Sequence, residues 1–283
     1  MIEGYLALTK PRITWLILLS TAIGFLFGAG AGWSGWTFLH CLLGTGLLAS
    51  GTAALNQWYE READGKMHRT QARPIPSGRV PEKNAFWFGL ALVVAGSVDL
   101  WLGTNPLTAG LGLFTVVSYL AAYTPLKRVS PHSTTIGAIP GAMPPLLGFA
   151  AAANALTAEA WALFAILFVW QFPHFYAIAW MYREDYERAG IRMLPVVEPD
   201  GESTARRIFW TSLAMIPVSI LPKLLGMTGT IYAVGAAAAG VAFALVAWRL
   251  SSQLSRKGAR SVLLASVVYL PVIYLLLVVD RVR

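Results

Sequence analysis

The feature that most constrains this chain is a stretch from Ile13 to Tyr59 without a single Asp, Glu, Lys or Arg. A charge at the centre of a bilayer costs about 2.5–3.5 kcal/mol on insertion scales, so charge-free stretches of this length indicate membrane spans. Further charge-free stretches follow, at 100–126, 129–158, 160–182, 208–222, 224–248 and 261–279. We therefore expect an integral membrane protein.

The spacing of these stretches predicts an all-α bundle of nine transmembrane helices. The expected helices lie near 13–30, 37–58, 85–102, 107–124, 136–152, 160–181, 207–224, 229–248 and 261–279. At about 20 residues per span, nine spans use roughly 180 residues and leave too few for a separate soluble domain. Residues 1–283 are thus expected to form one integral-membrane domain, with function inside the bundle or in its longer loops.

The net charge of +8 raises the question of nucleic-acid binding, but the distribution of the charges argues against it. With nine spans, 19 of the 22 Lys and Arg residues fall on one side of the membrane, and only Lys223, Arg281 and Arg283 fall on the other. By the positive-inside rule the basic side is cytoplasmic, which places the amino terminus inside and the carboxyl terminus outside.

Two further observations concern the compartment. Cys41 is the only cysteine, which excludes a disulfide framework and a cysteine-ligated metal site. The apolar run after Arg12 is long enough to span a bilayer and more spans follow, so we interpret it as the first helix rather than a signal peptide. No Arg-rich amphipathic segment precedes it, which favours a bacterial inner membrane over an organelle.

Two long polar loops are expected on the cytoplasmic side, at 59–84 and 182–206. Where the chain enters the first, Asn56, Glu60 and Asp64 recur every four residues and so lie on one face of a helix. Interfacial salt bridging is the ordinary explanation for such acids. However, a polar column that runs inward from the interface is costly unless it faces a cavity, which favours a functional interpretation.

Oxygen ligands without histidine or cysteine suit Mg²⁺, which uses a few carboxylates together with substrate phosphates. Carboxylates cannot hold a diphosphate alone because both are anionic, so a metal ion must bridge them. The same loop offers cations for the remaining phosphate oxygens, at Lys66, Arg69, Arg73 and Arg79. These residues together indicate a diphosphate site at the cytoplasmic face.

The second loop begins with mixed charges, Arg183-Glu184-Asp185-Tyr186-Glu187-Arg188. This is what a second half-site for the same ligand requires. An exposed helix stabilised by neighbouring charge pairs explains the spacing equally well.

The chain resembles the membrane prenyltransferase superfamily of the 4-hydroxybenzoate polyprenyltransferase type. Its first acidic motif, Asn-x₃-Asp-x₃-Asp, appears as Asn56-x₃-Glu60-x₃-Asp64. Further ordered matches are similar to the heme O synthase (protoheme IX farnesyltransferase) branch: Lys10-Pro11-Arg12, Met67-x-Arg69-Thr70, Tyr123-Thr-Pro-Leu-Lys127-Arg128, Gly141-Ala-Met-Pro144-Pro145, Trp170-Gln-Phe-Pro173-His174-Phe175 and Glu184-Asp185-Tyr186 with Met193-Leu194-Pro195.

This resemblance implies a bundle around a central lipid-accessible cavity, covered by the two polar cytoplasmic loops. It also implies Mg²⁺-dependent transfer of a farnesyl group from farnesyl diphosphate to a vinyl group of heme b, giving heme O. The implied partners are membrane lipid and, in the cell, heme A synthase or oxidase assembly factors; nucleic acid is not among them.

The resemblance also implies roles for individual residues. Metal and catalytic roles go to Asn56, Glu60, Asp64 and Asp185, and diphosphate binding goes to Lys66, Arg69, Arg73, Lys127 and Arg128. Asp185 and Glu184 are substitutes, because Tyr182 and Tyr186 occupy the positions of the superfamily's second Asp-x₃-Asp motif. His174 is expected to contact heme; the alternative for a histidine after Pro173 is a hydrogen bond to backbone carbonyls freed by that proline.

Two other functions fit parts of the pattern. A transporter predicts charges deep in several spans and often a repeated half, whereas here the charges gather at one face. An enzyme that prenylates a quinone-precursor aromatic ring shares the acidic site and differs in its acceptor pocket, so it stays open as the alternative.

Overall fold

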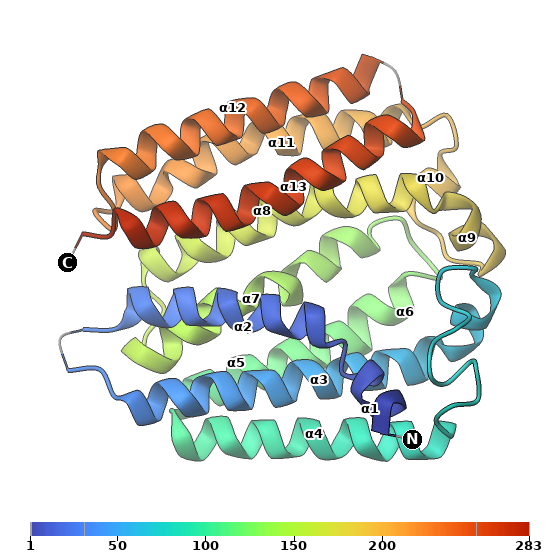
Figure 1. Cartoon of the computed structure of the whole chain (residues 1–283), viewed down its shortest axis with the longest axis horizontal. Helices are drawn as coiled ribbons and strands as arrows, with labels where there is room; N and C mark the ends of the chain where they lie inside the picture. The colour runs from blue at the N-terminus through green and yellow to red at the C-terminus, as the bar shows by residue number, and fades with distance from the viewer. Residues whose placement is uncertain (1, 31, 253, 283) are drawn as a thin grey trace.

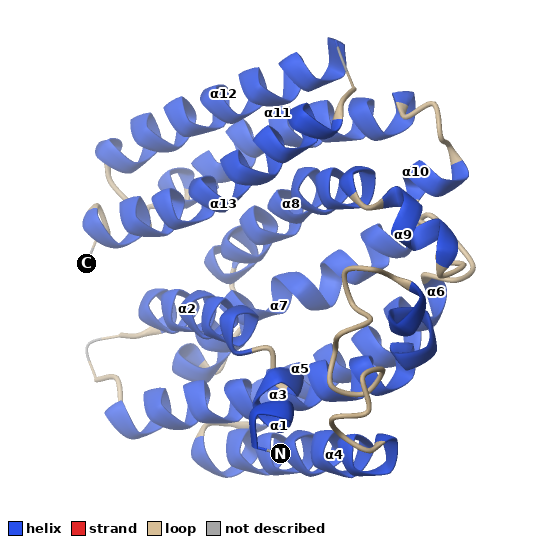
Figure 2. Ribbon diagram, turned by 45° about the vertical axis from the view of Figure 1, so that its right-hand side comes forward, coloured by secondary structure: helices blue, strands red, loops and turns tan. Residues whose placement is uncertain are grey.

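The structure is a computed structural model that describes residues 2–30, 32–252 and 254–282. The helices of this part are α1 (Ile2–Leu8), α2 (Pro11–Gly28), α3 (Gly35–Lys66), α4 (Glu82–Gly103), α5 (Pro106–Val117), the π-helix η1 (Ser118–Tyr123), α6 (Thr124–Leu126), α7 (Ser133–Ala153), α8 (Ala158–Met181), α9 (Arg183–Arg188), α10 (Leu194–Val197), α11 (Glu202–Leu224), α12 (Thr230–Ser252) and α13 (Arg256–Val279). The long helices run side by side (Figure 1), and the described residues form helices and loops without a strand (Figure 2). The expected all-α class is confirmed.

Within the described residues, eight helical segments are long and apolar enough to cross a membrane. They are α2, α3, α4, the α5–η1–α6 segment, α7, α8, α12 and α13. Large apolar side chains such as Trp15, Leu102 and Val279 lie exposed on these helices, as contact with lipid requires. The chain is thus a multi-pass membrane protein. The seventh expected span corresponds to α11, which is not among the eight, so the count of nine stays a prediction.

Several helices begin where their sequence dictates. Pro11 and Pro106 occupy first helical positions, where a missing N–H costs nothing. The side chains of Ser34, Asn105 and Ser255 accept hydrogen bonds from backbone N–H groups in the first turns of α3, α5 and α13. These caps fix the ends of the spans against the loops.

Helices α2 and α7 pack with their backbones in direct contact near the middle of the molecule. A β-carbon added to Gly24 would lie 1.9 Å from the carbonyl oxygen of Pro145, and one added to Gly148 would lie 1.9 Å from that of Thr21. Small residues permit this approach between membrane helices. Helix α7 also packs against α3, α5 and α8, so it joins the two sides of the bundle.

The cytoplasmic loops expected at 59–84 and 182–206 differ in detail from the prediction. Helix α3 continues to Lys66, so its last two turns replace the start of the first loop, and the second loop contains α9 and α10. Both loop regions lie at one end of the molecule, together with the carboxyl end of α3 and α6 (Figure 1). Because α3 is continuous, Asn56, Glu60 and Asp64 stay on one helical face.

Candidate active site

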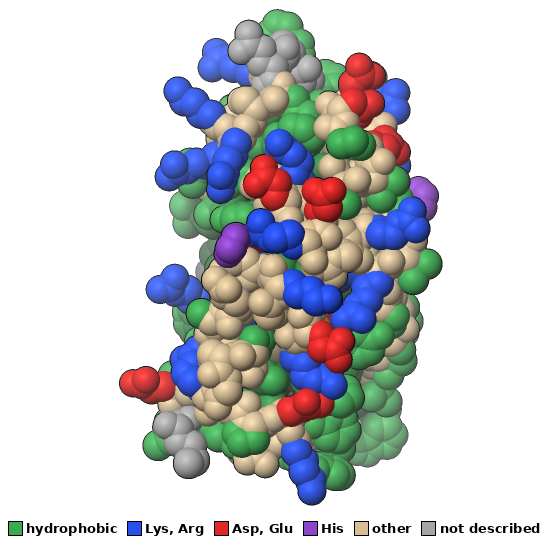
Figure 3. Space-filling view, turned by 90° about the vertical axis from the view of Figure 1, so that its right-hand side faces the viewer, with side chains coloured by type: hydrophobic (Ala, Val, Ile, Leu, Met, Phe, Trp, Pro, Cys, Tyr) green, Lys and Arg blue, Asp and Glu red, His purple; other side chains and the backbone are tan. Residues whose placement is uncertain are grey.

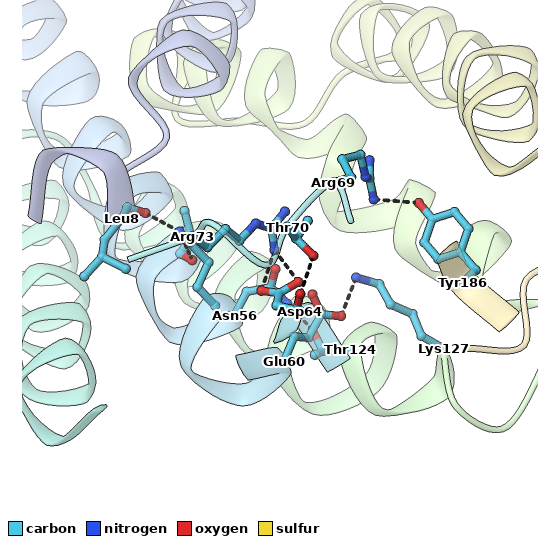
Figure 4. A network of polar contacts seen from close by, with 12 residues as sticks. Leu8, Asn56, Glu60, Asp64, Arg69, Thr70, Arg73, Thr124, Lys127 and Tyr186 are labelled. Carbon is cyan, nitrogen blue, oxygen red and sulfur yellow. Dashed lines mark hydrogen bonds and ion pairs between the residues drawn. The ribbon is translucent and has the colours of Figure 1, made fainter. Parts of the chain in front are cut away.

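Asp64 lies in the last turns of α3 and has a side chain with 0% exposure. Both of its carboxylate oxygens accept hydrogen bonds from Nη1 of Arg73, at 2.8 and 2.7 Å. The chain turns back after α3 because the Thr70 hydroxyl donates to the backbone carbonyl of Asp64 at 3.0 Å (Figure 4). The turn therefore places Arg73, from the loop, against the acidic face of α3.

Glu60 lies one turn before Asp64 and accepts a hydrogen bond from Nζ of Lys127 at 2.7 Å (Figure 4). The Lys127 ammonium also lies 4.3 Å from the ring centre of Tyr123. Burial by itself lowers the pKa of Lys127, but the negative charge of Glu60 outweighs it and raises this pKa well above its ordinary value. Lys127 is thus a permanent cation beside the acidic face of α3.

Asn56, the innermost member of the column, is buried and donates through Nδ2 to the hydroxyl of Thr124 at 3.3 Å. That hydroxyl in turn donates to the carbonyl of Tyr119 at 2.8 Å, inside the π-helix η1. A π-helical turn widens the chain locally and is frequent at functional sites. Here a carbonyl of the π-helix accepts from the Thr124 hydroxyl that pairs with Asn56.

Lys10 is a site residue that the sequence did not reveal. It takes a left-handed backbone conformation (φ 49°) directly before Pro11. Burial, followed by the charge of Arg73, lowers the pKa of Lys10 to about 7, while Glu60 and Asp64 act to raise it. The only signal for Lys10 in the sequence is its place in the Lys10-Pro11-Arg12 match.

The two polar loops meet at Asp185. Its carboxylate accepts hydrogen bonds from the backbone N–H groups of His68 and Arg69, each at 3.3 Å, and pairs with Arg188. Burial acts to raise the pKa of Asp185, but these two N–H groups and Arg188 outweigh it and hold the pKa below its ordinary value. Asp185 thus joins the loop after α8 to the loop after α3 by hydrogen bonds.

The two tyrosines at the superfamily's second acidic positions face Arg69. Its guanidinium lies 4.9 Å from the ring centre of Tyr182 and 5.4 Å from that of Tyr186, and it donates to the Tyr186 hydroxyl at 3.1 Å. Lys66 and Arg128, the other two predicted diphosphate ligands, are exposed. The face formed by these loops displays interleaved basic and acidic side chains, with apolar side chains along its flank (Figure 3).

The donor set fits a magnesium ion in part. Asn56, Glu60 and Asp64 offer oxygen atoms on one helical face, and Mg²⁺ needs only one or two carboxylates beside waters and phosphate. Among the described residues, no three His, Cys, Asp or Glu side chains group closely enough to hold a metal. Asp185 is thus not brought into one metal-binding group with Glu60 and Asp64.

His174 lies apart from the acidic residues, on α8, and its Nδ1 is 2.8 Å from the hydroxyl of Ser266 on α13. The hydroxyl donates to the carbonyl of Leu263 at 2.6 Å, so it must accept from the His174 N–H. Trp170 stacks on the imidazole, with ring centres 4.7 Å apart. The hydrogen bond of His174 Nδ1 therefore goes to Ser266, not to a carbonyl freed by Pro173, and Nε2 keeps its lone pair.

The comparison with known proteins identifies the family. The model of the UbiA prenyltransferase family matches residues 17–270. The chain belongs to this family. A relative from Solibacter usitatus, named protoheme IX farnesyltransferase, is 59% identical over 99% of each chain. The resemblance to membrane prenyltransferases is therefore confirmed, and the chain is an enzyme of this class.

Solved structures of UbiA-type proteins share the fold. A structure described as digeranylgeranylglyceryl phosphate synthase has a TM-score of 0.82 at 17% identity, and the match covers 99% of this chain and 98% of that one. A UbiA homolog from Archaeoglobus fulgidus, bound to DMAPP and Mg²⁺, has a TM-score of 0.67 at 16% identity, with 98% and 99% covered. These similarities establish the UbiA fold for this chain.

Proposed function

We propose that this UbiA-family enzyme transfers a farnesyl group from farnesyl diphosphate to a vinyl group of heme b, producing heme O. The observation that carries the proposal is the meeting of Glu60 and Asp64 with the cations Lys127 and Arg73. The name of the Solibacter usitatus relative supports the choice of donor and acceptor. DMAPP and Mg²⁺ in the Archaeoglobus fulgidus homolog support a prenyl diphosphate and a divalent ion.

The cations at the site are arranged to receive a departing diphosphate. Arg73 presents a planar guanidinium suited to bidentate phosphate contact, and Lys127 stays protonated beside Glu60. Lys10, with its low pKa, gains a proton most readily when an anion arrives. Bound at Asn56, Glu60 and Asp64, Mg²⁺ would supply Lewis-acid neutralisation of the leaving group.

The acceptor receives the farnesyl carbon in a region poor in water. Tyr119 and Tyr123 lie beside the site with ring centres 4.9 Å apart, and aromatic faces stabilise an allylic cation. The new carbon–carbon bond forms at the vinyl terminus as the bond from the farnesyl carbon to diphosphate breaks. Water then adds its hydroxyl group to the other vinyl carbon and releases a proton. We propose His174 Nε2 as the group that contacts the heme, and place the enzyme in a bacterial inner membrane with the amino terminus inside.

The proposal is tested with purified enzyme, farnesyl diphosphate, Mg²⁺ and heme b in detergent or liposomes. We expect a product whose mass equals that of heme b plus a farnesyl group and a hydroxyl group, and no product after chelation of the metal. The control reaction supplies 4-hydroxybenzoate in place of heme. Prenylation of that ring, with heme b unchanged, would assign the enzyme to the quinone pathway instead.

A further inference from the structure

A cavity of about 710 Å³ opens between the two polar loops, the end of α8 and the start of α13. We call it the cap pocket. Its volume lies within the range of roughly 300–1,000 Å³ that is typical of small-molecule sites. Of the five cations predicted to bind diphosphate, only Arg69 lines it. The cap pocket therefore shares Arg69 with the predicted diphosphate-binding residues and is otherwise lined by residues outside that set.

The cap pocket carries positive charge that the protein leaves unneutralised. Four arginines line it, Arg69, Arg183, Arg188 and Arg256, against the carboxylates of Glu184 and Asp185. Asp185 is taken up by Arg188 and by backbone N–H groups. Within the described part of the chain, the other three arginines form no ion pair. Such an arrangement favours an anionic ligand.

The same cavity has an apolar wall. Trp180, Met181 and Leu254 line it, and Arg183 lies 4.5 Å from the ring centre of Trp180. The ligand is thus amphipathic, with an apolar body and anionic groups.

Helix α8 carries both Met181, which lines the pocket, and His174. Met181 follows His174 by seven residues, so the two lie on nearly the same helical face, about 10 Å apart along the axis. Ionised carboxylates avoid hydrocarbon, so they stay at the cytoplasmic end while an attached apolar ring extends inward. A porphyrin that enters in this direction brings its ring toward His174 and keeps its carboxylates among the arginines.

We propose that the cap pocket binds the two propionate carboxylates of the porphyrin acceptor and that Arg183 and Arg256 contact them. This inference rests on the proposed function, because it assumes heme b as the acceptor. It assigns two residues outside the acidic motif to acceptor recognition. It also fixes the direction of the porphyrin, with propionates toward the cytoplasm and the ring toward the bundle.

The test combines binding and turnover. Iron protoporphyrin IX and its dimethyl ester are titrated into wild-type enzyme in detergent, and we expect the diacid to bind about tenfold more tightly. Arg183→Gln and Arg256→Gln should each remove most of this preference. They should also raise KM for heme b about tenfold without changing KM for farnesyl diphosphate. Lys257→Gln is the matched control, because Lys257 is an exposed neighbour of Arg256 that does not line the pocket.

The outcomes separate this inference from the proposed function. Equal binding of diacid and diester by the wild type overturns the inference and needs no variant. A raised KM for farnesyl diphosphate alone also overturns it, because the arginines then hold the diphosphate. A preference for the diacid that both arginine variants keep also overturns it. If both variants lose the preference but the wild type does not farnesylate heme b, the pocket assignment stands and the proposed function fails.

Discussion

Asp64 and Arg73 form an ion pair in which the Asp64 carboxylate has no exposure. Removing the carboxylate therefore affects both folding and chemistry. We expect Asp64→Asn to reduce kcat by at least about 100-fold, because a residue that holds the site's charges contributes on that scale to the transition state. The measurement is heme farnesylation at saturating substrates. Glu62→Gln, an exposed change on the same helix, is the control and should keep its activity.

A purely structural role for Asp64 predicts a different result. Breaking a buried ion pair leaves Arg73 without its partner and lowers stability. The double variant Asp64→Asn with Arg73→Gln removes both charges, so thermal stability should partly return. If activity returned with it, neither side chain would act directly in the reaction, and the assignments of Asp64 to the metal and of Arg73 to diphosphate would both be wrong.

Lys10 introduces a pH dependence. Its pKa in the folded protein is about 7, against an ordinary value of 10.5, so it is charged below pH 7 and neutral above it. Below about pH 7 the buried charge lowers the free energy of unfolding. Between pH 7 and 10.5 Lys10 is protonated only in the unfolded chain, so the free energy of unfolding rises with pH over this range. An anion bound at the site favours the charged form.

We expect wild-type enzyme to bind inorganic pyrophosphate less tightly at pH 8 than Lys10→Arg does, and equally tightly at pH 6. From pH 6 to pH 8, the dissociation constant of the wild type divided by that of Lys10→Arg should grow by up to about tenfold. The reason is that only about a tenth of a base stays protonated one pH unit above its pKa. Arginine keeps its charge throughout, so it serves as the reference for the ionisation of pyrophosphate itself. Parallel pH profiles would exclude Lys10 from the site.

Among the elements, the α2–α7 contact depends on glycine. Gly148→Ala places a methyl group against the carbonyl of Thr21, where backbone cannot yield, so we expect a loss of about 1–3 kcal/mol. The measurement is thermal unfolding in detergent. Gly110→Ala on α5 is the control, because nothing lies within 4 Å of the added carbon, and alanine favours a helix. Equal melting temperatures for both variants would mean that the close contact between α2 and α7 does not contribute to stability.

Prediction from sequence succeeded where a local pattern determines the structure. The charge-free stretches predicted where the long helices lie. The four-residue spacing predicted that Asn56, Glu60 and Asp64 share one face of α3. It failed where partners are distant in the chain. The bonds from Asn56 to Thr124 and from His174 to Ser266, and the place of Lys10, depend on how helices pack, which no local spacing encodes.

At the scale of the whole molecule, the distribution of basic residues predicts the orientation in the membrane. The loop after α3 and the start of α13 carry Lys and Arg at the end where the acidic site lies, and the link between α2 and α3 lies at the opposite end (Figure 1). A diphosphate made in the cytoplasm reaches the site only if the first end faces inward. Orientation and function are therefore coupled.

Single-cysteine labelling tests this orientation. Cys41 is buried, and replacing it with Ala leaves no native thiol. Gln71→Cys lies exposed in the loop after α3, and Gly30→Cys lies exposed in the link between α2 and α3, with open space around the new side chain. A membrane-impermeant thiol reagent should label Gly30→Cys on intact spheroplasts and Gln71→Cys only after lysis. The reverse pattern would place the acidic site outside the cell, where cytoplasmic farnesyl diphosphate cannot reach it.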